Sequence, residues 1–172
     1  VGLNPTRDAI ITVLRRMGAD ITISNIRNTG EPYGDITVRS TANLRATDVE
    51  PHEIPNLIDE IPILAVAAAF AKGTTTIRNA AELRVKESDR IATTVTNLRA
   101  MGANVKEFED GLAVTGGTPL HGATLQSYHD HRIAMGFLMA GLNADGETTL
   151  LNCANINTSY PGFEEHLREL TR

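Results

Sequence analysis

Hydrophobic positions recur at helical spacing in two segments that end in nearly the same way. The first segment places four apolar side chains on one helical face, at Ile10, Val13, Leu14 and Met17. The second repeats this arrangement with Ile91, Val95, Leu98 and Met101. Each segment is followed by a glycine, which ends helices, and then by a short β-branched stretch. The pattern therefore predicts two copies of a helix followed by a strand.

Capping residues mark where the helices are expected to begin. Asn4 followed by Pro5 predicts the start of the first helix, because asparagine caps helices and proline favours their first turn. Ser88 is expected to cap the second amphipathic helix in the same way. Asp59 and Asp130 each precede an apolar segment, and they predict the caps of two further helices.

Those two further segments, residues 61–71 and 133–142, are apolar on every side, which predicts buried helices. Each is followed by a glycine and a stretch that contains β-branched residues, at 73–77 and 146–150. This self-similarity predicts a domain assembled from copies of one α/β unit, with helices inside and sheets outside. The first copy is expected to begin in mid-unit, since no apolar segment of this kind comes before it.

The composition, 41% hydrophobic and 22% charged, is that of an ordinary globular domain. The longest apolar run, residues 61–71, is too short to cross a bilayer, so no membrane partner is expected. A formal charge of −5, with 4% aromatic residues and no tryptophan, disfavours nucleic acid as the main ligand. The single cysteine, Cys153, cannot form an internal disulfide and fits a reducing, cytoplasmic location. Any bound anion must therefore be held by a local cluster of cations.

The densest group of charges lies in residues 84–90, where three cations and two carboxylates meet at a predicted loop-to-helix junction. One interpretation is a solvated helix start, with Ser88 as the cap and Asp89 favoured by the helix dipole. However, Lys86 and Arg90 lie at the positive end of the helix, where the dipole disfavours cations. A bound anion would account for both of them, and we favour that interpretation.

A second charged group, residues 129–132, contains two histidines, an aspartate and an arginine. A metal site is weakly supported, because no further cysteine or histidine lies nearby in the sequence. A cap by Asp130 with a paired arginine and a pocket for phosphate or carboxylate remain equally consistent with the pattern. The repeat would bring Asp59 to the same end of the domain, where a carboxylate beside cations could act as a base or an acid.

Four motifs together resemble the EPSP synthase (3-phosphoshikimate 1-carboxyvinyltransferase) family: residues 57–62, 84–90, 130–135 and 159–163. They occur in the order that this family shows and span essentially the whole chain. The run around Lys86 is the most specific, because it separates this family from the enolpyruvyl-transferring enzyme of cell-wall synthesis. The resemblance implies a two-domain enzyme with an α/β fold, in which each domain contains three copies of a βαβαββ unit that form an inside-out α/β barrel. The chain resembles most of the family's C-terminal domain, with repeats at about 1–50 (partial), 51–118 and 119–172.

The resemblance also implies an activity and roles for particular residues. Family members transfer the carboxyvinyl group of phosphoenolpyruvate to the 5-hydroxyl of shikimate 3-phosphate, release phosphate, and are blocked by glyphosate. By resemblance, Asp59 is the base for the attacking hydroxyl and Glu87 protonates the methylene carbon. The implied substrate-binding residues are Lys86, Arg90, His131 and Arg132, besides Asp59. No cofactor or metal is implied, and the implied partners are the two substrates and an absent N-terminal domain.

Two positions depart from the family pattern, and two other functions remain open. Thr158 stands where some members carry a phosphate-binding lysine, and Glu82 stands where some carry an asparagine. Without the other domain, the isolated chain is expected to be inactive. The alternatives are a non-catalytic α/β-repeat module that binds a phosphorylated metabolite or a partner, and enolpyruvyl transfer to another acceptor.

Overall fold

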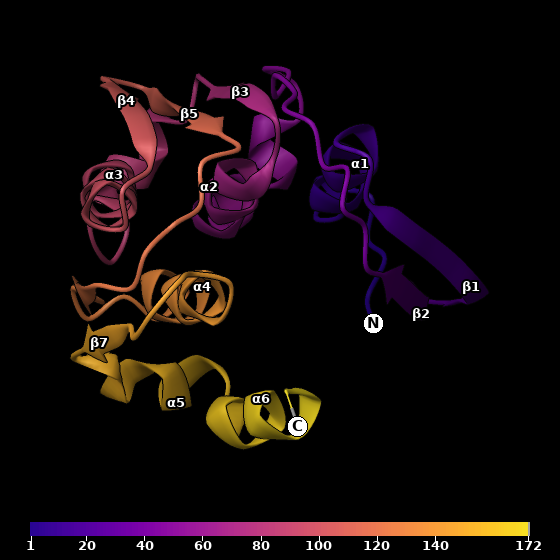
Figure 1. Ribbon diagram of the computed structural model, residues 1–172. Coiled ribbons are helices and arrows are strands. Elements are labelled where there is room, and N and C mark those ends of the chain that lie inside the picture. Colours follow the sequence, from indigo (N-terminus) through magenta and orange to yellow (C-terminus); the bar gives the residue numbers. More distant parts are fainter. Residues whose placement is uncertain (172) are drawn as a thin grey trace.

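The computed structural model describes residues 1–171, which form three α/β units in chain order (Figure 1). Three helices lie beside one another in the middle, namely α2 (Ile61–Phe70), α3 (Arg90–Ala100) and α4 (His131–Leu142). The sheets of the second and third units lie on the outer side of these helices (Figure 1). The prediction of inner helices and outer sheets is thus confirmed for this part of the chain. No helix within residues 1–171 is long and apolar enough to cross a membrane.

The first unit consists of α1 (Ala9–Arg16) and an antiparallel hairpin of β1 (Asp20–Thr29) and β2 (Glu31–Arg39). The helix begins after Asp8, so the predicted start at Asn4 and Pro5 was wrong. Instead, the Asn4 side-chain oxygen accepts hydrogen bonds from the backbone and the hydroxyl of Thr6, at 3.0 and 2.8 Å. Asparagine binds its own nearby backbone as readily as it caps a helix, and here the turn prevails.

The second unit has the βαβαββ order that the family resemblance implies. Residues 45–48 pair in parallel with the chain around β3 (Gly73–Ile77), and they precede the short helices η1 (Ile54–Asn56) and η2 (Ile58–Glu60). Then follow α2, β3, η3 (Ala81–Val85), α3, β4 (Asn104–Phe108) and β5 (Gly111–Gly116). The three strands form an antiparallel sheet in the order β3-β5-β4.

The sheet of the second unit approaches the end of α2 very closely. A Cβ atom at Gly116, the last residue of β5, would lie 2.2 Å from the carbonyl oxygen of Ala68 and 2.3 Å from that of Ala71. Real Cβ atoms do not come so near to backbone oxygens, so only glycine fits here without a shift of the helix. This contact sets the distance between α2 and its sheet.

The third unit contains β6 (Thr124–Gln126) and β7 (Thr149–Leu151), which pair in parallel on either side of α4 in the sequence. After β7 the chain forms η4 (Cys153–Asn155), α5 (Ile156–Ser159) and α6 (Phe163–Leu170). The cap of α4 is Asp130, as predicted, because its carboxylate accepts hydrogen bonds from the backbone N–H groups of Arg132 and Ile133.

The apolar helices α2 and α4 form the centre of the core, where Leu64 and Ala68 are buried with Phe137. The prediction that they are buried on every side is only partly right. Ile63 keeps 36% of its surface exposed and Leu142 keeps 50%. Ile63 lines an apolar hollow between the two helices, whereas Leu142 lines a separate hollow on α4.

Candidate active site

Asp59 lies at the entry to α2, but it does not cap that helix as the sequence predicted. The capping position belongs to Glu60, and neither side chain accepts a hydrogen bond from the first turn. Asp59 is instead part of the short helix η2. Its carboxylate, 19% exposed, is therefore available for the charged side chains around it.

Four cations from different parts of the chain surround the Asp59 carboxylate. Its Oδ1 lies 3.1 Å from Nη1 of Arg90 and 3.6 Å from Nζ of Lys86. Its Oδ2 lies 3.4 Å from Nη2 of Arg7 and 3.9 Å from Nη2 of Arg132. Burial raises the pKa of the Asp59 carboxyl, but these four positive charges outweigh burial and lower it. The group is thus a carboxylate at neutral pH.

Arg90 is buried, and it joins α3 to the start of α4. Its Nε donates to Oδ2 of Asp130 at 2.8 Å and its Nη2 lies 3.3 Å from Oδ1 of the same carboxylate. The side chains of the pair expose 1% and 0% of their surface. Burial raises the pKa of Asp130, whereas the hydrogen bond and charge of Arg90 and the capped backbone lower it, with a net downward shift. The same carboxylate therefore orients Arg90 and begins α4.

Lys86 and Glu87 lie just before α3, and each forms an ion pair with a side chain of opposite charge. The Lys86 ammonium lies 2.6 Å from Oε1 of Glu82, and this hydrogen bond outweighs burial and raises the pKa of Lys86. Glu87 accepts a hydrogen bond from Nη2 of Arg90 at 2.5 Å, while half of its side chain stays exposed. Ser88, predicted as the cap of α3, donates instead to Asp130 at 3.1 Å, and Asp89 is the cap.

Arg132 reaches back from α4 to the segment that carries Asp59. Its Nη1 donates to the backbone oxygen of Asp59 at 3.0 Å and to Oε1 of Glu60 at 3.1 Å. The neighbouring His131 is half-buried, and within residues 1–171 its ring has no hydrogen bond or ion pair. It lies beside Arg132 in the sequence, but it is not joined to the charged cluster.

The structure thus brings five of the six predicted site residues into one ion-pair network: Asp59, Lys86, Glu87, Arg90 and Arg132. From the sequence, we attributed the cations at the helix starts to a bound anion. In the structure, carboxylates of the chain itself already pair with them. Arg7, Glu60 and Glu82 belong to the same network, but sequence reasoning did not assign them to the site. Arg7 lies in a loop of the first unit, and no local signal links that loop to η2.

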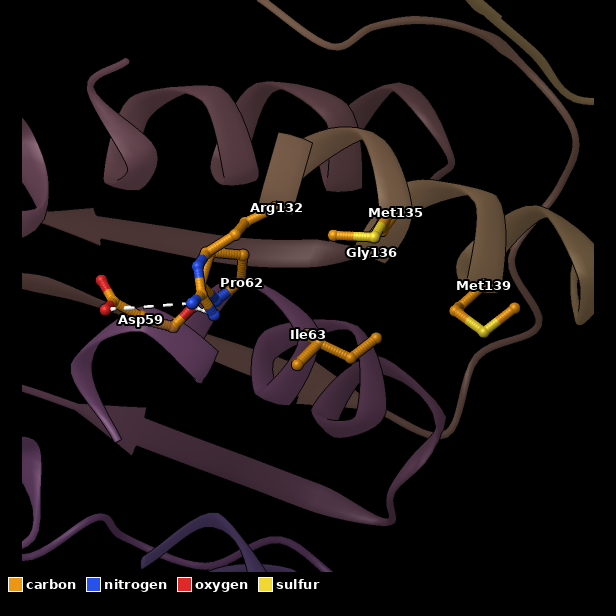
Figure 2. A pocket seen from close by; sticks show the side chains of 7 residues that line it. All are labelled: Asp59, Pro62, Ile63, Arg132, Met135, Gly136 and Met139. Carbon is orange, nitrogen blue, oxygen red and sulfur yellow. Dashed lines mark hydrogen bonds and ion pairs between the residues drawn. The ribbon is translucent and has the colours of Figure 1, made fainter. Parts of the chain in front are cut away.

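A cavity of about 170 Å³ adjoins the network and has one polar end, formed by Asp59 and Arg132 (Figure 2). The rest of its lining is apolar, with Ile63 on α2 and Met135 and Met139 on α4 (Figure 2). A second hollow of about 200 Å³ shares Ile63 and Met139, and it continues to α1. We call this continuous surface the α2/α4 groove.

Two other sequence-level interpretations can be compared with the structure. The two histidines at 129 and 131 suggest a metal only weakly, and residues 1–171 contain no group of three or more metal-binding side chains. Cys153 donates to the carbonyl oxygen of Leu150 at 3.3 Å, and burial raises the pKa of its thiol. A protonated, half-buried thiol fits a packing role.

The chain is similar to proteins of one enzyme family along nearly its whole length. A model of the family described as EPSP synthase (3-phosphoshikimate 1-carboxyvinyltransferase) matches residues 1–167. The 3-phosphoshikimate 1-carboxyvinyltransferase of Akkermansia muciniphila is 61% identical over 171 residues, which make up 98% of this chain and 39% of that protein. The protein of the same name from Desulforamulus reducens is 54% identical, over 99% of this chain and 40% of its own length.

Solved structures show the same relationship. EPSP synthase from Acinetobacter baumannii matches with a TM-score of 0.95 and 42% identity, over 98% of this chain and 40% of that one. The enolpyruvyl transferase NikO from Streptomyces tendae matches with a TM-score of 0.75 and 27% identity, over 95% of this chain and 35% of that one. The chain therefore has the mixed α/β fold of these transferases, and it spans 39–40% of the length of the two curated relatives.

Proposed function

The chain belongs to the EPSP synthase family, and on this premise we propose that it supplies one half of an active site for enolpyruvyl transfer. In the proposed reaction, the carboxyvinyl group of phosphoenolpyruvate passes to the 5-hydroxyl of shikimate 3-phosphate and phosphate leaves. The proposal rests on one observation: four cations lie within 4 Å of the Asp59 carboxylate. One of them, Arg90, also binds Glu87. Two anionic substrates repel one another, and clustered cations offset that repulsion.

Asp59 is the proposed general base, which accepts the proton of the attacking hydroxyl. Its lowered pKa keeps it ionised before substrate arrives. Anionic substrates would then neutralise part of the surrounding positive charge, and the carboxylate would become a stronger base in the complex. Oδ2 is the oxygen with the longer contacts, so it is the one that a substrate hydroxyl can approach.

Glu87 is the proposed acid that protonates the methylene carbon, because its side chain is half-exposed and held in place by Arg90. Lys86 and Arg132, both partly exposed, are proposed to bind the substrates' anionic groups once their present carboxylate partners are displaced. Arg90 is proposed to contribute to substrate binding mainly by orienting its neighbours Asp59 and Glu87, because its side chain is almost fully buried. His131 is proposed to line the same site.

The proposal includes a second domain and a cytoplasmic location. The proposed repeats are at about 1–50 (partial), 51–118 and 119–172, although residues 45–48 pair with the second unit. The first unit contains only a helix and a hairpin. The α2/α4 groove is apolar and uncovered within residues 1–171, as expected if further chain packs there. The family's N-terminal domain would complete the binding site for shikimate 3-phosphate.

A chimera tests this function. In the chimera, the present chain replaces the matching segment of the Akkermansia muciniphila relative, and the unmodified relative is the control. We expect phosphate release that requires both substrates, and none from the 172-residue chain alone. A folded chimera that releases no phosphate, while the unmodified relative does, would contradict the proposal.

One observation favours a second candidate, a non-catalytic module that binds a phosphorylated metabolite. Each of the four cations around Asp59 is already paired with carboxylates of the chain, so none of these cations depends on a substrate for a counter-ion. This candidate predicts that phosphoenolpyruvate perturbs the NMR signals of Lys86 and Arg132 in the chain, while the folded chimera stays inactive. Turnover by the chimera would exclude it.

A further inference from the structure

Arg7 is the one member of the charged network that comes from the first unit, and neither the motifs nor the family match assigns it a role. Its Nη2 lies 3.4 Å from Oδ2 of Asp59 and 3.8 Å from Oε1 of Glu60. The other cation near Oδ2 is Arg132, at 3.9 Å, and its Nη1 is already bound to the backbone of Asp59 and to Glu60. Arg7 is therefore the nearest cation to that oxygen.

The loop that carries Arg7 is built to hold it there. The Asn4 side chain closes a turn on Thr6, and the backbone N–H of Arg7 donates to the backbone oxygen of Asn4 at 2.8 Å. The Asn56 side chain, just before η2, donates to the backbone oxygen of Pro5 at 3.4 Å. The loop and the segment of Asp59 are thus tied together close to the charged cluster.

The two oxygens of Asp59 differ in how they are held. Oδ1 faces Arg90, whose side chain is 1% exposed and fixed by Asp130. Oδ2 faces Arg7, whose side chain is 56% exposed and carries the longer contact. The first oxygen is locked, whereas the second has longer contacts and can accept a hydrogen bond from a substrate hydroxyl while Arg7 stays beside it. A cation at the rim is thus placed to influence the direction in which this second oxygen points.

We propose that Arg7 is a positioning residue of this site, which holds Oδ2 of Asp59 toward the substrate hydroxyl. The inference deepens the proposed function, since it assigns a further residue to the base. It also states a property of the chain by itself, because the contact between Arg7 and Asp59 exists without substrate.

The effect of Arg7 on Asp59 must be separated from that of its other charged neighbours. These neighbours are Lys86 and Arg90 near α3, Arg132 on α4, and the carboxylates Glu60, Glu82, Glu87 and Asp130. Arg7 is one of four cations that lower the pKa of Asp59, and it has the smallest influence of the four. Its removal should therefore raise the pKa of Asp59 without abolishing the downward shift.

The direct experiment follows the Asp59 carboxyl by NMR during a pH titration of the 172-residue chain. We expect the midpoint to move to higher pH in Arg7→Gln and to return close to the original value in Arg7→Lys. Arg39→Gln is the matched control, since it removes an equally charged, exposed arginine from the far hairpin. A folded Arg7→Gln variant whose Asp59 titrates as in the original chain would overturn the inference.

A second readout uses the chimera and separates this inference from the proposed function. Arg7→Gln should lower kcat/KM roughly two- to fivefold, as expected for an exposed ion pair, and shift the acid limb of its pH profile upward. Arg7→Lys should restore both. A loss confined to KM, with an unmoved acid limb, would contradict a positioning role. An inactive chimera would contradict the proposed function alone, because the NMR titration needs no turnover.

Discussion

Arg90 and Asp130 form a buried ion pair that joins the start of α3 to the start of α4, with 2.8 Å between Nε and Oδ2. Two charges removed from water are costly unless each has its partner. This pair also determines where neighbouring groups lie, because Asp130 caps α4 while Arg90 contacts Asp59 and Glu87. The geometry of the candidate active site therefore depends on the buried ion pair between Arg90 and Asp130.

Replacement of Asp130 by asparagine tests how much this contact stabilises the fold. Asparagine can still cap α4, but it leaves the buried Arg90 without its main counter-ion. We expect a loss of about 3 kcal/mol in the free energy of unfolding. This value is at the lower end of the range for a broken buried ion pair, because Arg90 keeps Asp59 and Glu87 as partners. Urea denaturation measures it. Asp110→Asn, which removes the partly exposed partner of Arg78, should cost much less, and equal losses in the two variants would contradict this account.

The stability of the chain should fall in acid. Asp130 and Glu53 both have lowered pKa values. Burial raises the pKa of Asp130, but its contacts with Arg90 lower it further. The pKa of Glu53 is lowered mainly by its hydrogen bond with Arg16. A lowered pKa in the folded state contributes stability above the unfolded value, near pH 4, that is lost as the pH falls below it. Denaturation midpoints measured from about pH 6 down to about pH 3 should therefore decrease. The decrease should be smaller in Asp130→Asn, and an unchanged slope in that variant would argue against the assignment.

Asp59→Asn should remove the proposed base without removing the fold. In the chimera we expect kcat to fall by about 10²–10⁴-fold, the usual range for loss of a general base. The melting temperature should change little, because Arg90 and Arg132 keep their other partners. Asp110→Asn provides the control for an arginine-paired aspartate far from the cluster. Near-normal turnover by Asp59→Asn would reject its role as the base.

Glu82 is expected to compete with anionic ligands for Lys86. The two side chains are 2.6 Å apart, and Glu82 is largely exposed, so its removal should leave the ammonium with only its longer contact to Asp59 and more accessible to a ligand. We expect Glu82→Gln to tighten phosphoenolpyruvate binding to the chain about two- to fivefold, the range for an exposed ion pair. Calorimetric titration measures it. Weaker binding would instead indicate that Glu82 itself holds part of the ligand.

The sequence predicted those features that depend on local patterns. The helix expected over 61–71 is observed as Ile61–Phe70, and Asp130 caps α4 as expected. The start at Asn4 and the cap at Asp59 failed for a common reason. Each side chain binds another group instead of capping a helix, and for Asn4 that group is Thr6, two residues later in the sequence. For Asp59 it is a group of cations from three units.

The rest of the site depends on contacts between units, which no single segment encodes. Arg7 reaches the cluster because its loop is tied to Asn56, about fifty residues later in the sequence. The exposure of Ile63 has the same origin, since an evenly apolar helix does not reveal which side finds a partner. Motif spacing predicted a common cluster, and the structure brings five of its six residues together, but the spacing could not show that carboxylates of the chain already pair with the cations.

Gly116 and Asp59 stand near opposite ends of α2, which spans about 15 Å. The interior is close-packed, so a side chain at position 116 would press on the end of this helix. We expect the carboxylate at the other end to shift relative to Arg90 and Lys86. The absence of a side chain in a distant strand would thus help to set where the proposed base lies.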